Sequence, residues 1–226
     1  VFYKGKRLNE DAPIRVRPCS HVLKHTVHLD KVKAERFLLP ISKKKTHVIE
    51  IHAGQITTTD LTISLPPTLN FEPFGGYSKI AAVERHHNTG KIGVAVAKGY
   101  GIRNGAVASS VSHDSHNIIV IGDNDVDMAI AVNEIIRTQG GYTVVENGKV
   151  YETLALPIMG LMSDVGFENV NEALQRMIQK AHQMGVASQI DPFVTLSFLA
   201  LPVIPELRIT PRGICKMTAK GPAILS

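Results

Sequence analysis

Four strand-like runs that follow one another at short intervals constrain the fold of this 226-residue chain most strongly. They are Ile80–Val83, Ile92–Ala97, Ala106–Val111 and Ile118–Ile121. The intervals between them have the length of hairpin or meander connections, whereas two parallel neighbours need a crossover of about a dozen residues or more. The sequence therefore predicts a largely antiparallel sheet in this region.

Two helices are expected to cover this sheet. The first should begin at Asp123 or Asn124, either of which can cap a helix, and run to about Thr138. Apolar residues occupy much of its circumference, so it should be well buried. The second, Phe167–Met184, is amphipathic and ends before Gly185. The expected class is α+β: a largely antiparallel sheet packed against two main helices and preceded by a small β-rich segment.

The first 77 residues are less regular. A hairpin that turns at Lys4-Gly5 is expected, because glycine supplies the positive φ that such turns need. Further strand-like runs are Ile14–Val16, Phe37–Leu39, His47–His52 and Leu61–Leu65. Three prolines and two glycines mark residues 66–77 as a linker. We therefore expect a β-rich segment over residues 1–65, a linker over 66–77 and an α+β domain over 78–226.

Three later segments have local patterns of their own. Asn147-Gly148 favours a type I′ hairpin between two β-rich runs. Gly99 and Gly101 resemble part of a phosphate-binding loop, but a third glycine and a following helix are missing, which favours a simple turn. The prolines of Pro202–Leu207 exclude a central strand and permit an edge strand or a tail on the surface.

The charge is distributed unevenly along the chain. The net charge is +5, but the first fifty residues carry 12 Lys and Arg against 5 Asp and Glu. A basic arm can bind nucleic acid, yet this one lacks interleaved aromatic residues, and a solvated surface is the expected interpretation. No apolar run approaches the ~20 residues that span a bilayer, and Cys19 and Cys215 form no disulfide or metal motif. We expect a cytoplasmic protein with ordinary thiols and with neither membrane nor nucleic-acid partners.

Ser112–Asn117, which we call the polar block, places six polar or ionisable residues between two apolar runs. Buried polar groups without partners cost about 1–3 kcal/mol each, so the block indicates either a binding site or a self-satisfied tight turn. In an extended conformation His113 and Ser115 would share one side, and Asp114 and His116 the other. An Asp beside a His can fix its tautomer and raise its pKa, which suits proton transfer or the support of a metal ligand.

A second cluster, Glu84–His87, follows a neighbouring strand and could meet the polar block in a meander. Its Arg85 could clamp a carboxylate or stack on a planar ring, and the alternative is a solvated loop. His21, His25 and His28 have helical spacing, but no helix is predicted there and a metal role is not expected. The chain has no G-x-x-x-x-G-K-[ST], G-x-S-x-G or H-E-x-x-H motif. Most common catalytic mechanisms are therefore excluded for this chain acting alone.

Five segments carry the most specific pattern. They are Glu84–Gly93, Gly105–Gly122 with the polar block, Asn124–Met128, Leu156–Asp164 and Asp191–Leu207. In this order and spacing they closely resemble the C-terminal domain of bacterial adenine deaminase, over residues 70 to 210 or so. The opening hairpin looks like the end of the small β-sandwich that accompanies the barrel of this amidohydrolase family.

The resemblance implies that the full-length enzyme hydrolyses adenine to hypoxanthine and ammonia, with a manganese or iron pair activating the attacking water. The ligands of that pair belong to the family's barrel and include an H-x-H motif, which is absent here. No metal ligand is therefore carried over to this chain. We expect the chain to be the C-terminal portion of an adenine deaminase, inactive alone, with the upstream barrel portion and adenine as partners and a homo-oligomer as the assembled form.

The polar block is expected to close over or support the active site of that barrel. Supporting catalytic roles are expected for His113, Asp114 and His116. Contacts with the substrate are expected for Ser115, Asn117, Arg85 and His86. The alternative is a noncatalytic interaction or oligomerisation domain, in which the polar block is only a structural turn.

Overall fold

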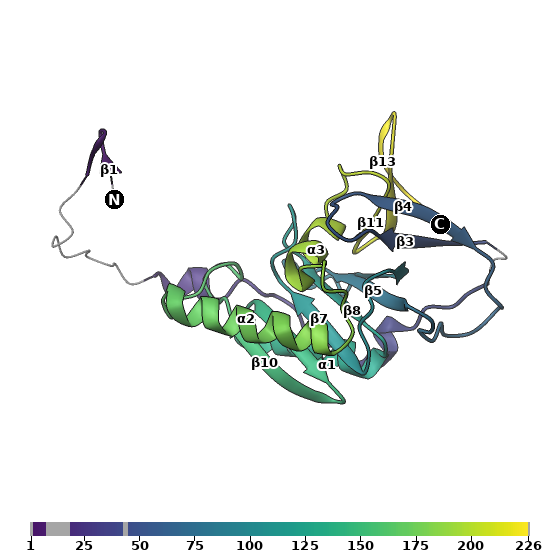
Figure 1. Ribbon diagram of the computed structural model, residues 1–226, viewed down its shortest axis with the longest axis horizontal. Coiled ribbons are helices and arrows are strands. Elements are labelled where there is room, and N and C mark those ends of the chain that lie inside the picture. Colours follow the sequence, from purple (N-terminus) through teal and green to yellow (C-terminus); the bar gives the residue numbers. More distant parts are fainter. Residues whose placement is uncertain (1, 8–18, 43–44, 226) are drawn as a thin grey trace.

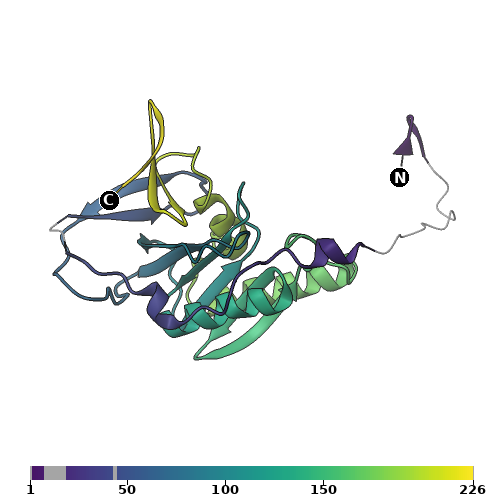
Figure 2. The same cartoon turned by 180° about the vertical axis from the view of Figure 1, so that it is seen from behind.

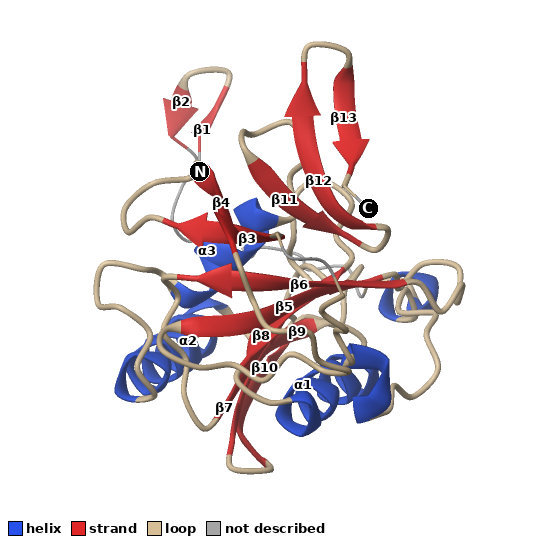
Figure 3. Cartoon of the chain, turned by 90° about the vertical axis from the view of Figure 1, so that its right-hand side faces the viewer, coloured by secondary structure: helices blue, strands red, loops and turns tan. Residues whose placement is uncertain are grey.

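The computed structural model describes residues 2–7, 19–42 and 45–225. Its centre is an eight-stranded sheet with the order β10-β9-β7-β8-β5-β6-β3-β4 (Figure 3). The neighbouring strands are antiparallel except β3 and β6, which run parallel, so the prediction of a largely antiparallel sheet is confirmed. The strands are β3 (Thr46–Ile51), β4 (Thr58–Ile63), β5 (Tyr77–Val83), β6 (Ile92–Lys98), β7 (Gly105–Ser109), β8 (Ile118–Gly122), β9 (Gly141–Glu146) and β10 (Lys149–Ala155).

Helices cover both faces of this sheet. α1 (Asp125–Thr138) packs on one face, and α2 (Phe167–Gln183) and α3 (Pro192–Leu199) pack on the other (Figures 1 and 3). Alternate residues of β8 enter the two cores, which explains why the central strands are continuous apolar runs. The α+β class is confirmed. Within the described ranges, no helix has both the length and the apolar character needed to cross a bilayer.

The structure confirms the helix cap and the turns that the sequence predicts. Asn124 caps α1, since its side chain accepts a hydrogen bond from the N–H of Asp127 at 2.8 Å. Asn147 and Gly148 have φ values of 50° and 78°, as a type I′ turn between β9 and β10 requires. The opening hairpin also forms, from β1 (Phe2–Tyr3) and β2 (Lys6–Arg7).

Residues 19–42 form a strap that runs along the α1 side of the sheet (Figure 2). It contains two 3₁₀ helices, η1 (His21–Lys24) and η2 (Ala34–Phe37). The strand predicted at Phe37–Leu39 is wrong, because the buried Phe37 ring belongs to η2 and packs into the core beneath α1. The strand-like run Ile14–Val16 lies outside the described residues.

β3 and β4 belong to the same sheet as the later strands. β3 pairs with β6 in parallel, with Val48 opposite Val96. Residues 66–77, expected to link two domains, therefore connect two strands of one sheet. For the residues before β3, assignment to the β-sandwich of a preceding barrel stays a prediction.

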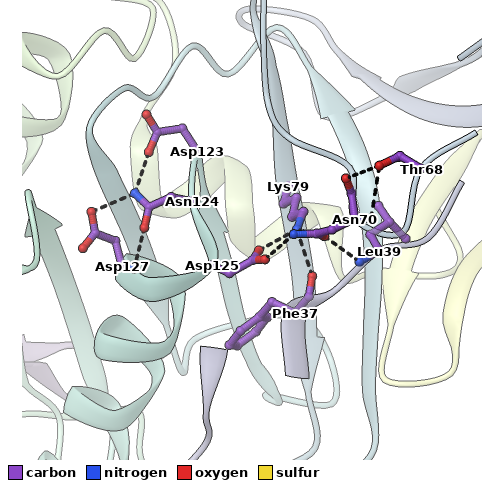
Figure 4. Close-up of polar contacts among 9 residues, drawn as sticks. All are labelled: Phe37, Leu39, Thr68, Asn70, Lys79, Asp123, Asn124, Asp125 and Asp127. Carbon is purple, nitrogen blue, oxygen red and sulfur yellow. Dashed lines mark hydrogen bonds and ion pairs between the residues drawn. The ribbon is translucent and has the colours of Figure 1, made fainter. Parts of the chain in front are cut away.

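A buried lysine fixes the connection between β4 and β5. Lys79, on β5, is 1% exposed, and its ammonium group contacts Asp125 Oδ1 and Asn70 Oδ1 at 2.6 Å each and the Phe37 carbonyl oxygen at 3.1 Å (Figure 4). Burial lowers the pKa of Lys79, and the bond with Asp125 opposes this shift. One side chain thus joins β5, α1, η2 and the 66–77 connection.

Residues 207–224 form a second, three-stranded sheet, which no sequence pattern predicted, whereas residues 202–206 before it form no strand. Its strands are β11 (Leu207–Thr210), β12 (Gly213–Thr218) and β13 (Gly221–Ile224). It lies directly on β6, since a Cβ atom added to Gly93 would be 2.0 Å from the Thr210 carbonyl oxygen. The buried Arg208 reaches the edge of the large sheet, where it donates to Thr58 Oγ1 at 2.7 Å. Burial lowers the pKa of Arg208 to about 10, so it stays charged at neutral pH.

Candidate functional site

The two polar clusters predicted from the sequence meet at one end of the large sheet. β5 pairs with β8 so that Val83 lies opposite Ile118, and this register brings residues 84–87 beside the polar block. The Arg85 N–H donates to Asn117 Oδ1 at 3.3 Å, and His86 Nε2 donates to the Ser115 carbonyl oxygen at 2.8 Å. The register of one antiparallel pair thus assembles the site.

Arg85 anchors this assembly. It is 2% exposed, and its Nη1 and Nη2 donate to the carbonyl oxygens of Thr26 and Met159 at 3.2 and 3.1 Å. Its Nε donates to the carbonyl oxygen of His116. One guanidinium group therefore holds the strap, the polar block and the loop before α2 together. These donors are directed at backbone oxygens of the chain itself. The role expected for Arg85 in binding a substrate stays a prediction.

The polar block is a tight turn, and the extended conformation considered for it is wrong. The His116 N–H donates to the Ser112 carbonyl oxygen at 2.7 Å, and the Ser112 hydroxyl donates to the Asn117 carbonyl oxygen at 2.5 Å. Asn117 Nδ2 donates to Ser115 Oγ at 3.1 Å. Local side-chain bonds of this kind compete with strand formation. Ser112 is therefore satisfied within the turn, and Asn117 by Ser115 of the turn together with the Arg85 N–H.

Three ionisable side chains of the block project from this turn. The His113 ring lies against the rings of Phe198 and His116, with centroid distances of 5.2 and 5.8 Å. The Asp114 side chain is 85% exposed, and its Oδ1 is 4.0 Å from His113 Nδ1, too far for a hydrogen bond. Asp114 therefore does not fix the tautomer of this histidine. His113 and Asp114 are left free to contact a ligand or another domain.

The surroundings of His116 favour its neutral form. Burial lowers the pKa of His116, and the neighbouring His113 and Arg85 lower it further. This direction is opposite to the one expected from an adjacent Asp. The Ser112 N–H donates to His116 Nδ1 at 3.3 Å, which places the proton of the neutral ring on Nε2. His116 thus offers a neutral N–H donor at physiological pH.

A hollow of about 430 Å³ opens beside the polar block. Its polar side contains Asp114, Ser115 and Asn117. Its apolar walls come from the segment after α3 and from the three-stranded sheet, and include Ala200, Leu201, Pro202, Val203, Ile209, Pro211 and Pro222. Apolar walls with a few polar groups on one side are typical of small-molecule sites. The sequence did not predict these walls, because proline-rich segments lack a periodic pattern.

Comparisons with known proteins cover most of this chain, including the candidate site. Residues 55–220 match the family model described as the adenine deaminase C-terminal domain. The chain belongs to this family. The adenine deaminase of Desulfitobacterium hafniense strain Y51 is 46% identical over 215 residues, which are 95% of this chain and 38% of that protein. The adenine deaminases of Petrotoga mobilis and Bacillus subtilis strain 168 are 44% and 42% identical and cover 95% and 82% of this chain.

The predicted resemblance to adenine deaminases is confirmed. The chain spans less than two fifths of the length of these three relatives, with shares of 38%, 39% and 34%. The part that matches the adenine deaminase C-terminal domain contains Arg85 and the whole polar block. It also contains the apolar walls of the hollow except Pro222, whereas the strap lies before it.

The metal pair implied for full-length adenine deaminases does not fit the residues of this chain that the structure describes. Over residues 2–7, 19–42 and 45–225, no three His, Cys, Asp or Glu side chains converge as metal ligands. His21 and His25 approach each other, with their Nε2 atoms 2.8 Å apart, but no third ligand of this described part joins them. No reaction step through a metal is assigned to these residues.

Glu84 should make the stability of the site depend on pH. Burial alone would raise its pKa, but hydrogen bonds from Thr89, His86 and His87 lower it from 4.5 to about 2. A carboxylate with a depressed pKa stabilises the fold fully above pH 4.5, and this contribution is lost as the pH falls towards 2. We expect Glu84→Gln to cost about 1–2 kcal/mol at neutral pH, since water partly screens the group, and much less near about pH 3.

Urea denaturation of the two proteins at a series of pH values measures this difference. Glu172→Gln, a change on the exposed side of α2, serves as the control and should show no such trend. A difference for Glu84→Gln that stays constant between neutral and acidic pH would contradict the prediction.

Proposed function

We propose that this chain is the C-terminal part of an enzyme that hydrolyses adenine to hypoxanthine and ammonia, and that its polar block completes an active site in an upstream barrel portion. Family membership supports the reaction, and the greater length of the relatives supports a further portion. On this proposal the manganese or iron pair belongs to the barrel, and the chain is inactive alone. A cytoplasmic role in purine salvage and a homo-oligomeric form belong to the same proposal.

The observation that supports the site most strongly is the exposure of Asp114 at the rim of a largely apolar hollow, with the partly exposed His113 directly before it in the chain. A purine has two flat apolar faces and an edge of hydrogen-bond donors and acceptors. The leucine and proline walls suit the faces, and the polar side of the hollow suits the edge. His116 in its neutral form adds a donor without adding positive charge near the metal pair.

The four residues expected to contact the substrate divide into two kinds. Arg85 and Asn117 use their polar side-chain atoms within the chain, so we assign them positioning roles. His86 also supports the block, through its bond to the Ser115 carbonyl oxygen. The Ser115 hydroxyl accepts from Asn117 and keeps its own proton for donation to a ligand.

Alanine at His113 or at His116 in the full-length enzyme should lower kcat/KM for adenine at least about tenfold, a typical effect for a group that donates or transfers protons. The melting temperature should change by no more than about 3 °C, because neither ring is part of the buried core. Ammonia release and thermal denaturation measure the two effects. His87→Ala is the matched control, since His87 is exposed on the neighbouring loop.

Unchanged kinetics in both variants would contradict a role in the active site. That result would favour the alternative, a noncatalytic interaction or oligomerisation domain. The 226-residue chain should show no turnover when assayed with adenine and manganese. A rate close to that of a full-length adenine deaminase would refute the proposal that it is inactive alone.

A further inference from the structure

An exposed apolar patch lies next to the polar block, and its side chains have no part in the site described above. It combines the start of the strap with the loop before α2 and the first residue of α2, and consists of Val22, Leu23, Met159, Met162, Val165 and Phe167. Val22 and Phe167 are 76% and 75% exposed, and the other four are between 38% and 51% exposed. A surface that gathers large apolar side chains in this way marks an interaction site.

Direct contacts fix the two segments of this patch to each other. The Met159 N–H donates to the Leu23 carbonyl oxygen at 2.6 Å, and Lys24 Nζ lies 2.5 Å from Asp164 Oδ2. Figures 1 and 2 show η1 next to the N-terminal end of α2, in agreement with these contacts. The patch is therefore organised before a partner binds, which reduces the entropy cost of binding.

The patch is also continuous with the proposed site. The Arg85 side chain donates both to the Met159 carbonyl oxygen and to the His116 carbonyl oxygen. The same guanidinium group holds the strap at Thr26, four residues after Val22. A domain that covers the patch would therefore lie beside the polar block.

We propose that the apolar patch is the docking surface for the metal-binding barrel portion of the same enzyme. This inference rests on the proposed function. In the Desulfitobacterium hafniense relative the match covers 38% of the protein, so about three fifths of its length lies elsewhere. A barrel seated on the patch would place its active site next to His113 and Asp114. The two methionines suit such a surface, because their flexible thioethers adapt to irregular shapes.

Two other occupants fit these observations less well. Nucleic acid would require unpaired cations, whereas Lys24, at the edge of the patch, is paired with Asp164. A second copy of this chain, bound to the patch, would occupy the face on which the barrel has to meet the polar block. Neither would explain why the patch and the polar block share one anchoring residue.

The accessibility of Phe167 to a thiol reagent tests the docking surface. Phe167→Cys, in a background with Cys19→Ser, is treated with a maleimide in the 226-residue chain and in the full-length enzyme. Cys215 is buried and should react slowly in both. We expect labelling at residue 167 to be at least about tenfold slower in the full-length enzyme, because a covered thiol reacts slowly. Leu69→Cys, at a position that is 91% exposed, should be labelled equally fast in both.

Equally fast labelling at residue 167 in both proteins would overturn the proposal. Slow labelling in both would also overturn it, and a dimer of the 226-residue chain in light scattering would then identify a second copy as the occupant. The labelling rate does not depend on turnover. Failure of the docking surface is therefore distinguishable from failure of the proposed function, which is tested by the kinetics of the His113 and His116 variants.

Discussion

Replacing Arg85 by methionine is expected to lower the free energy of unfolding of the chain by about 3–5 kcal/mol. The buried guanidinium group donates to the carbonyl oxygens of Thr26, His116 and Met159. Methionine fills much of the same space but supplies no donor, and an unsatisfied buried acceptor costs about 1–3 kcal/mol. Removal of a desolvated charge offsets only part of this loss. Urea denaturation followed by circular dichroism measures the change.

Arg176→Met is the matched control for this variant. Arg176 is 52% exposed at its side chain and pairs with Glu152 on the surface, where an ion pair contributes about 1 kcal/mol or less. If Arg85→Met unfolds at nearly the same urea concentration as the wild type, the three carbonyl oxygens find other donors. Arg85 would then not be the anchor that we describe.

Lys79→Met should lower the free energy of unfolding by a similar amount, about 3–4 kcal/mol. The change removes the cationic partner of Asp125, whose side chain is 15% exposed, and leaves a carboxylate that has little access to water and keeps the hydrogen bond from Asn70 Nδ2 at 2.9 Å. It also removes a donor from Asn70 and from the Phe37 carbonyl oxygen. Calorimetry and urea denaturation measure the loss, and hydrogen exchange should show increased opening of η2 and of residues 66–77.

Lys98→Met is the control for Lys79→Met, because Lys98 lies on β6 only two residues from Val96, the residue opposite Lys79, and forms a more exposed pair with Glu50 at 3.0 Å. Its loss should cost about 1 kcal/mol or less. Equal effects of the two substitutions would show that burial does not strengthen the dependence of the fold on Lys79.

Local sequence signals were sufficient for the elements whose neighbours in space are also neighbours in the chain. The short intervals between residues 78 and 122 predicted the meander, and Asn124 and Asn147-Gly148 marked a cap and a turn. The parallel pairing of β3 with β6 was not predictable, because it depends on the packing of distant segments. The strand predicted at Phe37–Leu39 is wrong, since three apolar residues in a row do not distinguish a strand from a buried 3₁₀ turn.

The candidate site was predictable in its polar residues and not in its geometry. Six polar residues between two apolar runs identified the polar block, and the strand register brought Arg85 to it. The block folds as a turn because Ser112 and Asn117 bond to nearby backbone and side-chain atoms, a competition that alternation rules do not include. The apolar hollow was not predictable, because its walls come from segments more than eighty residues after the block.

The contacts at Thr58 also affect how the chain folds during its synthesis. The backbone of Pro205 and Glu206 pairs with Thr58 at the outer edge of β4, and Arg208 bonds to the same residue across a separation of 150 residues. During synthesis β4 therefore appears long before the segment that covers this edge, and distant contacts of this kind form late in folding. An uncovered strand edge can add strands from other chains. A chain that stops before residue 205 would thus be prone to aggregation. In the whole chain, the segment of residues 205–208 covers this edge of β4.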